Sequence, residues 1–263
     1  MRLLFKHILK LNEYRDLLLV YVWREMRIRY KQSVLGLFWA FLQPLCMMLL
    51  FTVIFTLVMP TKIASYPYPV FFYTALIAWN FFANSLNAAI PSLVENYNLI
   101  TKIYFPREIL PLSGIILSGV DFLIAAVMLI PLLLFHGIGL TWQSLWFFPL
   151  GLLLLFFTTA VCLVLSALNV YYRDVKLLIN FLIQVWFFAT PVIYSIDSTP
   201  VRIKLVLLLN PLTFIIENFR RSIVEGRPVV LWQFLLMALF VSISMVIAYI
   251  FFKITEKKFA DVI

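Results

Sequence analysis

Few side chains in this 263-residue chain could do acid–base, thiol or metal chemistry. Asp121 is the one ionisable residue well inside an apolar segment, where a carboxylate can serve an ion pathway or pair across a helix interface. His136 follows the same segment with no second ligand nearby in sequence, and we interpret it as an interfacial histidine. Cys46 and Cys162 lie in apolar runs without metal-ligand spacing. The sequence therefore predicts no catalytic and no metal-binding residue.

The chain also lacks the sequence of a nucleotide-binding loop. No G-x-x-x-x-G-K-[ST] occurs in it, so ATP cannot bind here through such a loop. We therefore expect no cofactor on this chain and no ATPase activity of its own.

The composition is that of a membrane protein. Hydrophobic residues make up 64% of the chain and charged residues 13%, against about 25% charged in a typical soluble domain. The net charge of +9 resides mainly at the ends of apolar segments, which is typical of membrane topology rather than of nucleic-acid binding. These features predict an all-α integral membrane protein.

Six segments are long and apolar enough to cross a bilayer, which takes about 20 residues. They are residues 34–59, 70–90, 109–135, 144–170, 177–194 and 229–252. We expect two parts, a cytoplasmic interfacial arm over 1–33 and a transmembrane domain over 34–263. Most Lys and Arg residues then fall on one side, which places both termini in the cytoplasm.

The segment between the fifth and sixth spans, residues 195–228, is too apolar for a plain loop. Asn210-Pro211 divides it, because the residue before a proline is disfavoured in the helical region. Two short helices that enter the membrane and return would fit this pattern, provided that protein or water covers their backbone.

Residues 13–31 form a basic amphipathic segment ahead of the first span. An apolar stripe at helical spacing and a basic group roughly opposite predict a helix in the membrane interface; the stripe is Leu19, Val22, Trp23, Met26 and Tyr30, and the basic residues are Arg24, Arg27 and Lys31. Ser33 fits an N-cap for the first span. The alternative is a positive flank that only sets orientation.

A second amphipathic stretch lies in the loop between Pro91 and Pro111. Leu93, Tyr97 and Ile100 can share one face of a short helix. We expect that face to be offered to a partner, although a simple turn helix is the alternative.

Four phrases carry a resemblance to a known family. They are WREMRIRYKQSVLGLFWAFLQP, NLITKIYFPREILPLS, LNVYYRDVKLLINFLIQVWFFATPVIYS and LNPLTFIIENFRRSI, in this order. Together they resemble the permease subunit of ABC-2 class transporters that export polysaccharides, namely the O-antigen, teichoic-acid and capsule exporters. The resemblance covers nearly the whole chain.

This resemblance implies a homodimer of the permease in a bacterial or archaeal cytoplasmic (inner) membrane, with two copies of a separate subunit that binds ATP and Mg. The implied cargo is a lipid-linked polysaccharide; the alternative is an ABC-2 permease for a drug or a lipid. Residues 196–228 match the outer gate helices. The residues implied in coupling to the ATPase are Arg24, Arg27, Tyr97, Leu99, Ile100, Lys102, Arg173 and Asp174.

The first and fifth spans are the expected wall of the export path. Their aromatic side chains offer flat faces on which sugar rings can stack; the candidates are Phe38, Trp39, Phe41, Trp186, Phe187 and Phe188. The alternative is that these side chains pack helices or form interface belts. Gln43-Pro44 and Pro191 are expected to kink these two spans.

Overall fold

The computed structural model describes residues 14–30, 36–58 and 66–259, and the regular structure in those ranges is all helical. Its longer helices are α2 (Arg15–Tyr30), α3 (Trp39–Val53), α4 (Tyr68–Glu95), α6 (Ile109–Phe135), α7 (Phe147–Tyr171), α8 (Asp174–Phe188) and α11 (Leu231–Glu256). Its shorter helices are α5 (Tyr97–Lys102), α9 (Val201–Leu208) and α10 (Pro211–Phe219). Single turns and π-helical segments extend some of these: η1 (Gly36–Phe38), η2 (Ile54–Val58), η3 (Trp142–Trp146), η4 (Ile196–Ser198) and η5 (Arg220–Val224). Ser33 and the expected boundary at residue 33 lie outside the described residues.

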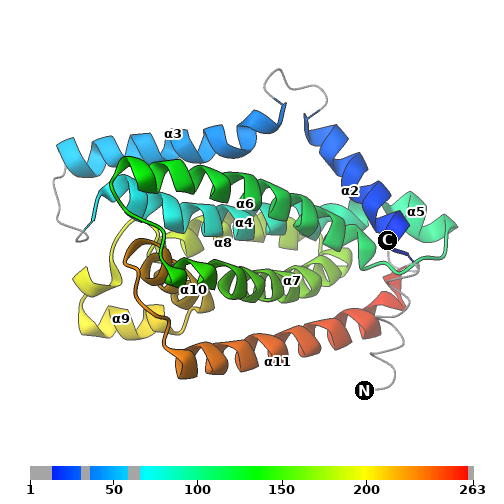
Figure 1. Ribbon diagram of the computed structural model, residues 1–263. Coiled ribbons are helices and arrows are strands. Elements are labelled where there is room, and N and C mark those ends of the chain that lie inside the picture. The colour runs from blue at the N-terminus through cyan, green and yellow to red at the C-terminus, as the bar shows by residue number, and fades with distance from the viewer. Residues whose placement is uncertain (1–13, 31–35, 59–65, 260–263) are drawn as a thin grey trace.

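Helix α4 is the centre of the bundle. It contacts α3, α6, α7 and α8, and most of its apolar and aromatic side chains are buried (Figure 1). Its closest neighbour is α6, because Gly114 on α6 lets the backbone approach Ala88: a Cβ at position 114 would lie 2.8 Å from the Ala88 Cβ. Small residues at such crossings are typical of helix packing in membranes.

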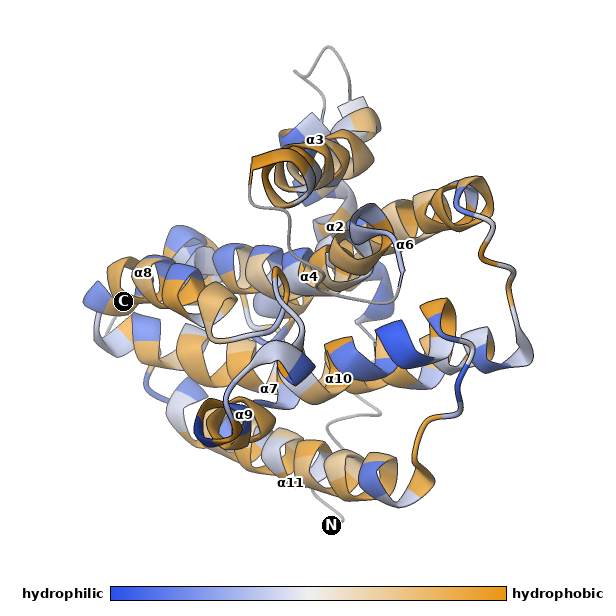
Figure 2. Ribbon diagram, turned by 90° about the vertical axis from the view of Figure 1, so that its left-hand side faces the viewer, coloured by the Kyte–Doolittle hydropathy of each residue, from blue (hydrophilic) through white to orange (hydrophobic). Residues whose placement is uncertain are grey.

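Helices α3 and α11 lie on opposite outer sides of this bundle (Figure 2). Helix α11 packs on α7, and large apolar side chains along both α3 and α11 remain exposed. Helices that are apolar on the outside as well as the inside are typical of a protein surrounded by lipid.

Four helical segments are long and apolar enough to cross a membrane: Trp39–Val58, Ile109–Phe135, Trp142–Tyr171 and Leu231–Glu256. They correspond to four of the six predicted spans. The second predicted span corresponds to α4, whose 28 residues extend about 42 Å at about 1.5 Å per residue. Six spans therefore stay a prediction.

The predicted fifth span, residues 177–194, is wrong at its outer end. Helix α8 begins at Asp174 and ends at Phe188 after 15 residues, which is about 22 Å of helix. Pro191 consequently lies in the turn after the helix and does not kink it, in contrast to Pro44, which lies inside α3. The apolar run continues through residues 189–194, which is why the predicted span is too long, although Pro191 disfavours a helical conformation at Thr190.

Two short helices do occupy the segment before α11. Helix α9 ends near Asn210, whose side-chain oxygen accepts a hydrogen bond from the Leu212 backbone N–H and so caps α10. The break predicted at Asn210-Pro211 is therefore confirmed. Entry of these helices into the membrane stays a prediction.

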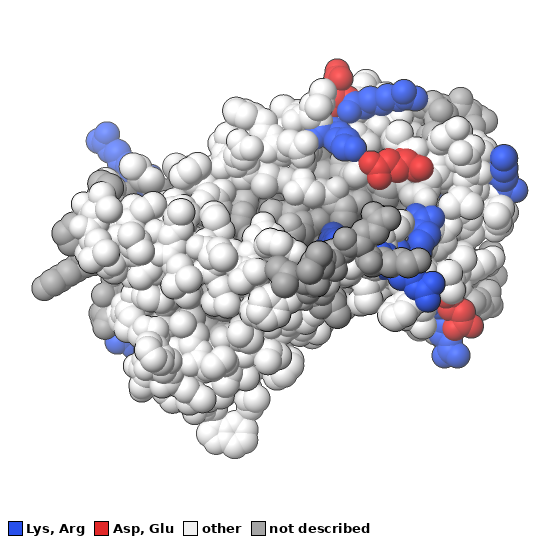
Figure 3. All heavy atoms as spheres, turned by 90° about the horizontal axis from the view of Figure 1, so that it is seen from above, with Lys and Arg blue, Asp and Glu red and all other residues white. Residues whose placement is uncertain are grey.

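The opposite end of the bundle, called the α5 end here, gathers α5 with the adjoining ends of α2, α4, α7, α8 and α11 (Figure 1). Non-covalent contacts join these ends: Tyr21 stacks on Phe105, and Tyr171 donates a hydrogen bond to the Thr255 carbonyl. In the view of Figure 3, charged side chains concentrate toward this end and the middle of the molecule is largely uncharged. Such a charge distribution is typical of a membrane protein.

Candidate functional site

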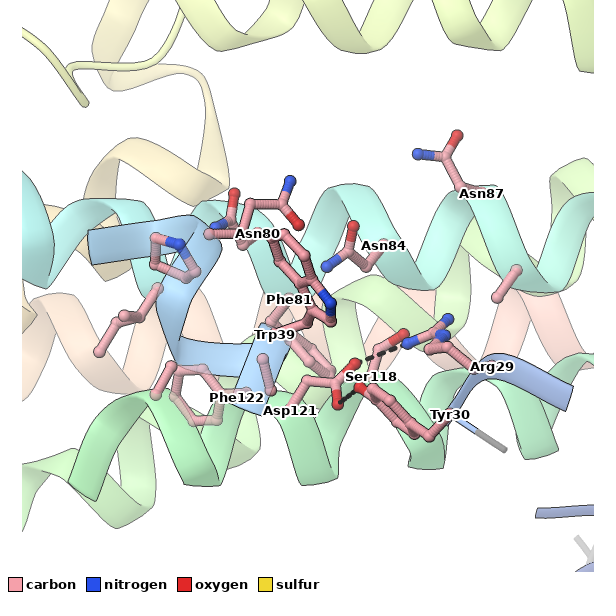
Figure 4. A pocket seen from close by; sticks show the side chains of 16 residues that line it. Arg29, Tyr30, Trp39, Asn80, Phe81, Asn84, Asn87, Ser118, Asp121 and Phe122 are labelled. Atoms are coloured by element: carbon pink, nitrogen blue, oxygen red, sulfur yellow. Dashed lines mark hydrogen bonds and ion pairs between the residues drawn. The ribbon is translucent and has the colours of Figure 1, made fainter. Parts of the chain in front are cut away.

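A polar cavity of about 470 Å³ lies between α3, α4 and α6, half-way along the bundle (Figure 4). Its polar lining is Arg29, Tyr30, Gln43, Asn80, Asn84, Asn87, Ser118 and Asp121, and its aromatic lining is Trp39, Phe81 and Phe122. A polar cavity between apolar helices is a candidate binding site, because its side chains require water or a polar ligand.

Three asparagines form the longest polar feature of the cavity. Asn80, Asn84 and Asn87 are spaced i, i+4 and i+7, so they share one face of α4. Asn84 and Asn87 are exposed although most of the surrounding helix is buried. Among the described residues, no hydrogen bond engages their side-chain amides. We call these three residues the amide stripe; amides at helical spacing inside an apolar helix were the sequence signal for it, and the sequence reasoning did not use it.

Asp121 lies opposite, in the middle of α6, and both of its oxygens are engaged. Arg29 Nη1 lies 2.6 Å from Oδ2, and the Tyr30 hydroxyl donates to Oδ1 at 2.6 Å (Figure 4). Burial and the hydrogen bond to Asp121 raise the pKa of Tyr30 to about 12, so the hydroxyl remains protonated and can donate at neutral pH. Of the two interpretations of Asp121, pairing across a helix interface is thus the one that the structure shows.

The six aromatic candidates differ in exposure and in packing. Phe38 and Trp39 are exposed and Trp39 lines the cavity, whereas Phe41 packs edge-on against Phe38. On α8, Phe188 is exposed. The other two α8 aromatics are half-buried against α4, with Trp186 edge-on to Phe82 and Phe187 edge-on to Trp79. Trp39 and Phe188 therefore keep a free face, while Trp186 and Phe187 mainly pack helices.

The expectation that Leu93, Tyr97 and Ile100 share an outward face is wrong for two of them. Leu93 is fully buried and Ile100 is 4% exposed, because both pack in a small core with Phe105 and Ile109. Tyr97 is 49% exposed. The outward face of this segment is instead formed by Tyr97, Asn98, Thr101, Lys102, Ile103 and Tyr104. Helix α5 begins two residues after the end of α4, so its register differs from the single continuous helix that the spacing assumed.

The two basic coupling candidates on α2 also differ in exposure: Arg24 is half-buried and Arg27 is exposed. Arg24 donates to the Asn96 side chain at 2.8 Å and thereby joins α2 to the α4–α5 junction, whereas Arg27 is exposed and lies over the Trp23 ring. Leu19 and Trp23 of the predicted apolar stripe face outward, at 63% and 55% exposure. Helix α2 contacts the bundle through the buried Tyr21 and, near its C-terminal end, through Tyr30 of the stripe, which donates to Asp121.

The remaining coupling candidates lie at the same end of the molecule. Arg173 and Asp174 are exposed between α7 and α8, and Leu99 is half-buried on α5. Lys176 beside them forms an ion pair with Glu95 at 3.0 Å, which fixes the start of α8 to the end of α4. Tyr97, Lys102, Arg27, Arg173 and Asp174 are therefore the candidates accessible to another protein.

A buried arginine at the other end was not anticipated from the sequence. Arg220 is 1% exposed, and its guanidinium lies 3.5 Å from the Phe71 ring centroid. It donates to the carbonyls of Phe71, Pro191 and Val192 and to the carboxylate of Glu217. Arg220 thus fixes the turn after α8 to α4 and to the α10–η5 segment.

Within residues 14–30, 36–58 and 66–259, no three His, Cys, Asp or Glu side chains are close enough together to hold a metal ion. The chemistry that the described site offers is hydrogen bonding by neutral amides, an aromatic face and a neutralised ion pair. Such a site can bind a polar ligand but shows no group for bond making or breaking.

Comparison with known proteins identifies the family. Residues 16–224 match the model of the ABC-2 type transporter family. The chain is 33% identical over 221 residues to the O-antigen export system permease protein RfbA of Myxococcus xanthus, covering 83% of this chain and 84% of that protein. It is 32% identical over 212 residues to RfbA of Klebsiella pneumoniae, covering 80% and 81%, and 24% identical over 208 residues to the polysialic acid transport protein KpsM of Escherichia coli, covering 77% and 79%. Because the family match extends over most of its length, this chain belongs to the ABC-2 type transporter family.

Proposed function

We propose that this chain is the transmembrane permease subunit of an ABC transporter that exports a lipid-linked polysaccharide of the O-antigen or teichoic-acid type. The observation that carries the proposal is the amide-lined cavity half-way along membrane-length helices, in a chain whose relatives are named for O-antigen and polysialic acid. An apolar drug or lipid would gain little from exposed amides, which makes the alternative cargo the weaker fit.

The proposed assembly has two copies of this chain, each with six spans and both termini in the cytoplasm of a bacterial or archaeal cell. Two copies of a separate subunit bind ATP and Mg and supply the free energy. Support comes from the four long apolar helices, from the length of α4, and from the charge concentrated at the α5 end. The export path runs between the two copies along α3 and α8, where Trp39 and Phe188 keep exposed aromatic faces.

The α5 end is the proposed contact with the ATPase. The accessible residues there are Tyr97 and Lys102 on α5, Arg27 on α2, and Arg173 with Asp174 at the start of α8. Ile100 and Leu99 contribute indirectly, because Ile100 is buried and packs α5 against the bundle.

A movement of α5 caused by the ATPase can be transmitted to the membrane helices through contacts between side chains. The Arg24–Asn96 hydrogen bond and the Tyr21–Phe105 stack join the α5 segment to α2. The Arg29–Asp121 ion pair then joins the far end of α2 to the middle of α6. Helix α2 is therefore the proposed lever, and α9 with α10 is the proposed gate at the outer face.

Deletion of this chain tests the proposal. The host should then accumulate its surface glycan in the cytoplasm while its other surface polymers stay unchanged. A tagged copy should restore export and should co-purify with an ATP-binding protein. Normal surface glycan in the deletion strain would refute polysaccharide export as the function.

A further inference from the structure

The amide stripe of α4 has a geometry suited to an elongated polar ligand. Asn87 lies seven positions after Asn80, which corresponds to about 10 Å along the helix axis. Asn84 lies between them on the same face, and Trp39 of α3 reaches into the same cavity from the facing side (Figure 4). The cavity is therefore lined by three amides along α4 and one indole from α3; in Figure 4, Asn87 lies apart from Trp39 and points away from it.

Lipid is an unsuitable neighbour for this stripe. Moving an amide from water to hydrocarbon without a new hydrogen bond is strongly unfavourable, because the hydrogen bonds that it made to water are lost. Asn84 and Asn87 are exposed near the middle of a membrane-length helix, and no described residue satisfies their amides. The stripe therefore requires water, a polar ligand, or polar groups from a second copy of the chain.

The charges of the cavity further restrict the ligand. Among the described residues that line the cavity, the charged ones are Arg29 and Asp121; they pair with each other and Tyr30 donates to Asp121, so these residues offer no unmatched charge to an ionic ligand. Each asparagine amide both donates and accepts hydrogen bonds, which suits a pair of neighbouring hydroxyl groups. An indole can in turn cover the apolar face of a sugar ring.

We propose that the cavity between α3, α4 and α6 binds successive sugar residues of the glycan, through hydrogen bonds from Asn80, Asn84 and Asn87 and stacking on Trp39. This inference rests on the proposed function and adds a binding site within each copy of the chain. The contacts are neutral and repeated along the helix, so each is individually weak and can be exchanged as the glycan moves.

Thiol labelling tests the site directly. Cys46 is replaced by Ser, Cys162 is kept because it is buried, and Asn84→Cys is introduced in this parent. Open membrane fragments are prepared from cells that make the glycan and from cells blocked at its first sugar transfer. ATP hydrolysis is arrested with orthovanadate, and a charged, water-soluble methanethiosulfonate reagent is added.

We expect the Asn84→Cys thiol to react, and to react about tenfold more slowly when glycan is present. Leu239→Cys, on the exposed face of α11, is the matched control and should react slowly in both membranes. Asn87→Cys provides a second position in case the first variant is not inserted. An unreactive thiol at both positions, or labelling that the glycan does not change, overturns the inference.

A further variant distinguishes three cases: glycan binding at this site, a contact between two copies of the chain, and failure of the proposed function. Asn84→Leu should reduce surface glycan while cross-linked dimers and co-purification with the ATPase persist. Loss of the dimer in this variant would show that the amides join two copies, and would overturn the inference. If deletion of the chain leaves surface glycan unchanged, the proposed function itself fails.

Discussion

Arg29 and Asp121 form a 2.6 Å ion pair that joins the C-terminal end of α2 to the middle of α6. The two residues are 92 positions apart, and the Tyr30 hydroxyl completes the site by donating to the second carboxylate oxygen. Together, Arg29 and Tyr30 join α2 to the centre of the bundle. The position of α2 is consequently coupled to the cavity that Asp121 helps to line.

Replacing Asp121 with Asn should destabilise the protein by about 1–3 kcal/mol, because Arg29 would remain charged in a partly buried site. The double variant Arg29→Gln/Asp121→Asn should recover part of this loss. Thermal unfolding in detergent of the wild type, the two single variants and the double variant measures the coupling. Strictly additive losses would show that the pair contributes no interaction energy.

Tyr97→Asp should weaken co-purification with the ATPase while the protein remains inserted and folded, because the side chain is exposed at the proposed contact. Ile100→Asp should instead lower the amount of folded protein, since it places a carboxylate in a buried apolar core. Trp142→Asp, at an exposed aromatic outside the α5 end, is the control. Undiminished ATPase binding by Tyr97→Asp would remove α5 from the coupling contact.

Trp39→Ala should slow export with little effect on stability, because Trp39 is 47% exposed and lines the cavity. Trp186→Ala should cost about 2 kcal/mol of stability, because its ring packs against Phe82 at a centroid distance of 5.0 Å. Surface glycan and thermal stability are measured on both variants. Equal effects of the two substitutions would contradict this division of roles.

Gly114→Ala should destabilise the α4–α6 contact by about 1–3 kcal/mol, because the new Cβ would lie 2.8 Å from the Ala88 Cβ. Gly119→Ala on the same helix is the matched control; its Cβ would make an ordinary 3.7 Å contact with Phe81 and should leave stability equal or higher. Unfolding temperatures in one detergent compare the two. A loss at position 119 as large as that at 114 would contradict the packing argument.

Arg220→Lys should destabilise the end of the bundle opposite α5 by about 3–5 kcal/mol, although the charge is kept. An ammonium group cannot reproduce the planar guanidinium that reaches the Phe71, Pro191 and Val192 carbonyls and Glu217 together. Limited proteolysis should then cut the segment between α8 and α11 faster than in the wild type. Arg221→Lys, beside it and only partly buried, is the control.

The sequence by itself determined the class of protein and most of its helices. Long apolar runs can satisfy their backbone in a bilayer only as helices, so α6, α7 and α11 begin and end close to the predicted positions. The break at Asn210-Pro211 was equally local, because proline disfavours the helical conformation of the preceding residue. The four phrases also identified the family from the sequence alone.

Tertiary structure decided which face of each helix is free. An apolar helix has no polar side to reveal its orientation, so the packing of Trp186 on Phe82 depends on a neighbour distant in sequence. The burial of Ile100 likewise depends on the small core that it shares with Phe105 and Ile109. The turn after α8 is likewise held by a residue distant in sequence, because Arg220 donates to the carbonyls of Pro191 and Val192. The polar cavity exists only because α2, α3, α4 and α6 bring Arg29, Trp39, Asn84 and Asp121 together, and no local pattern encodes that arrangement.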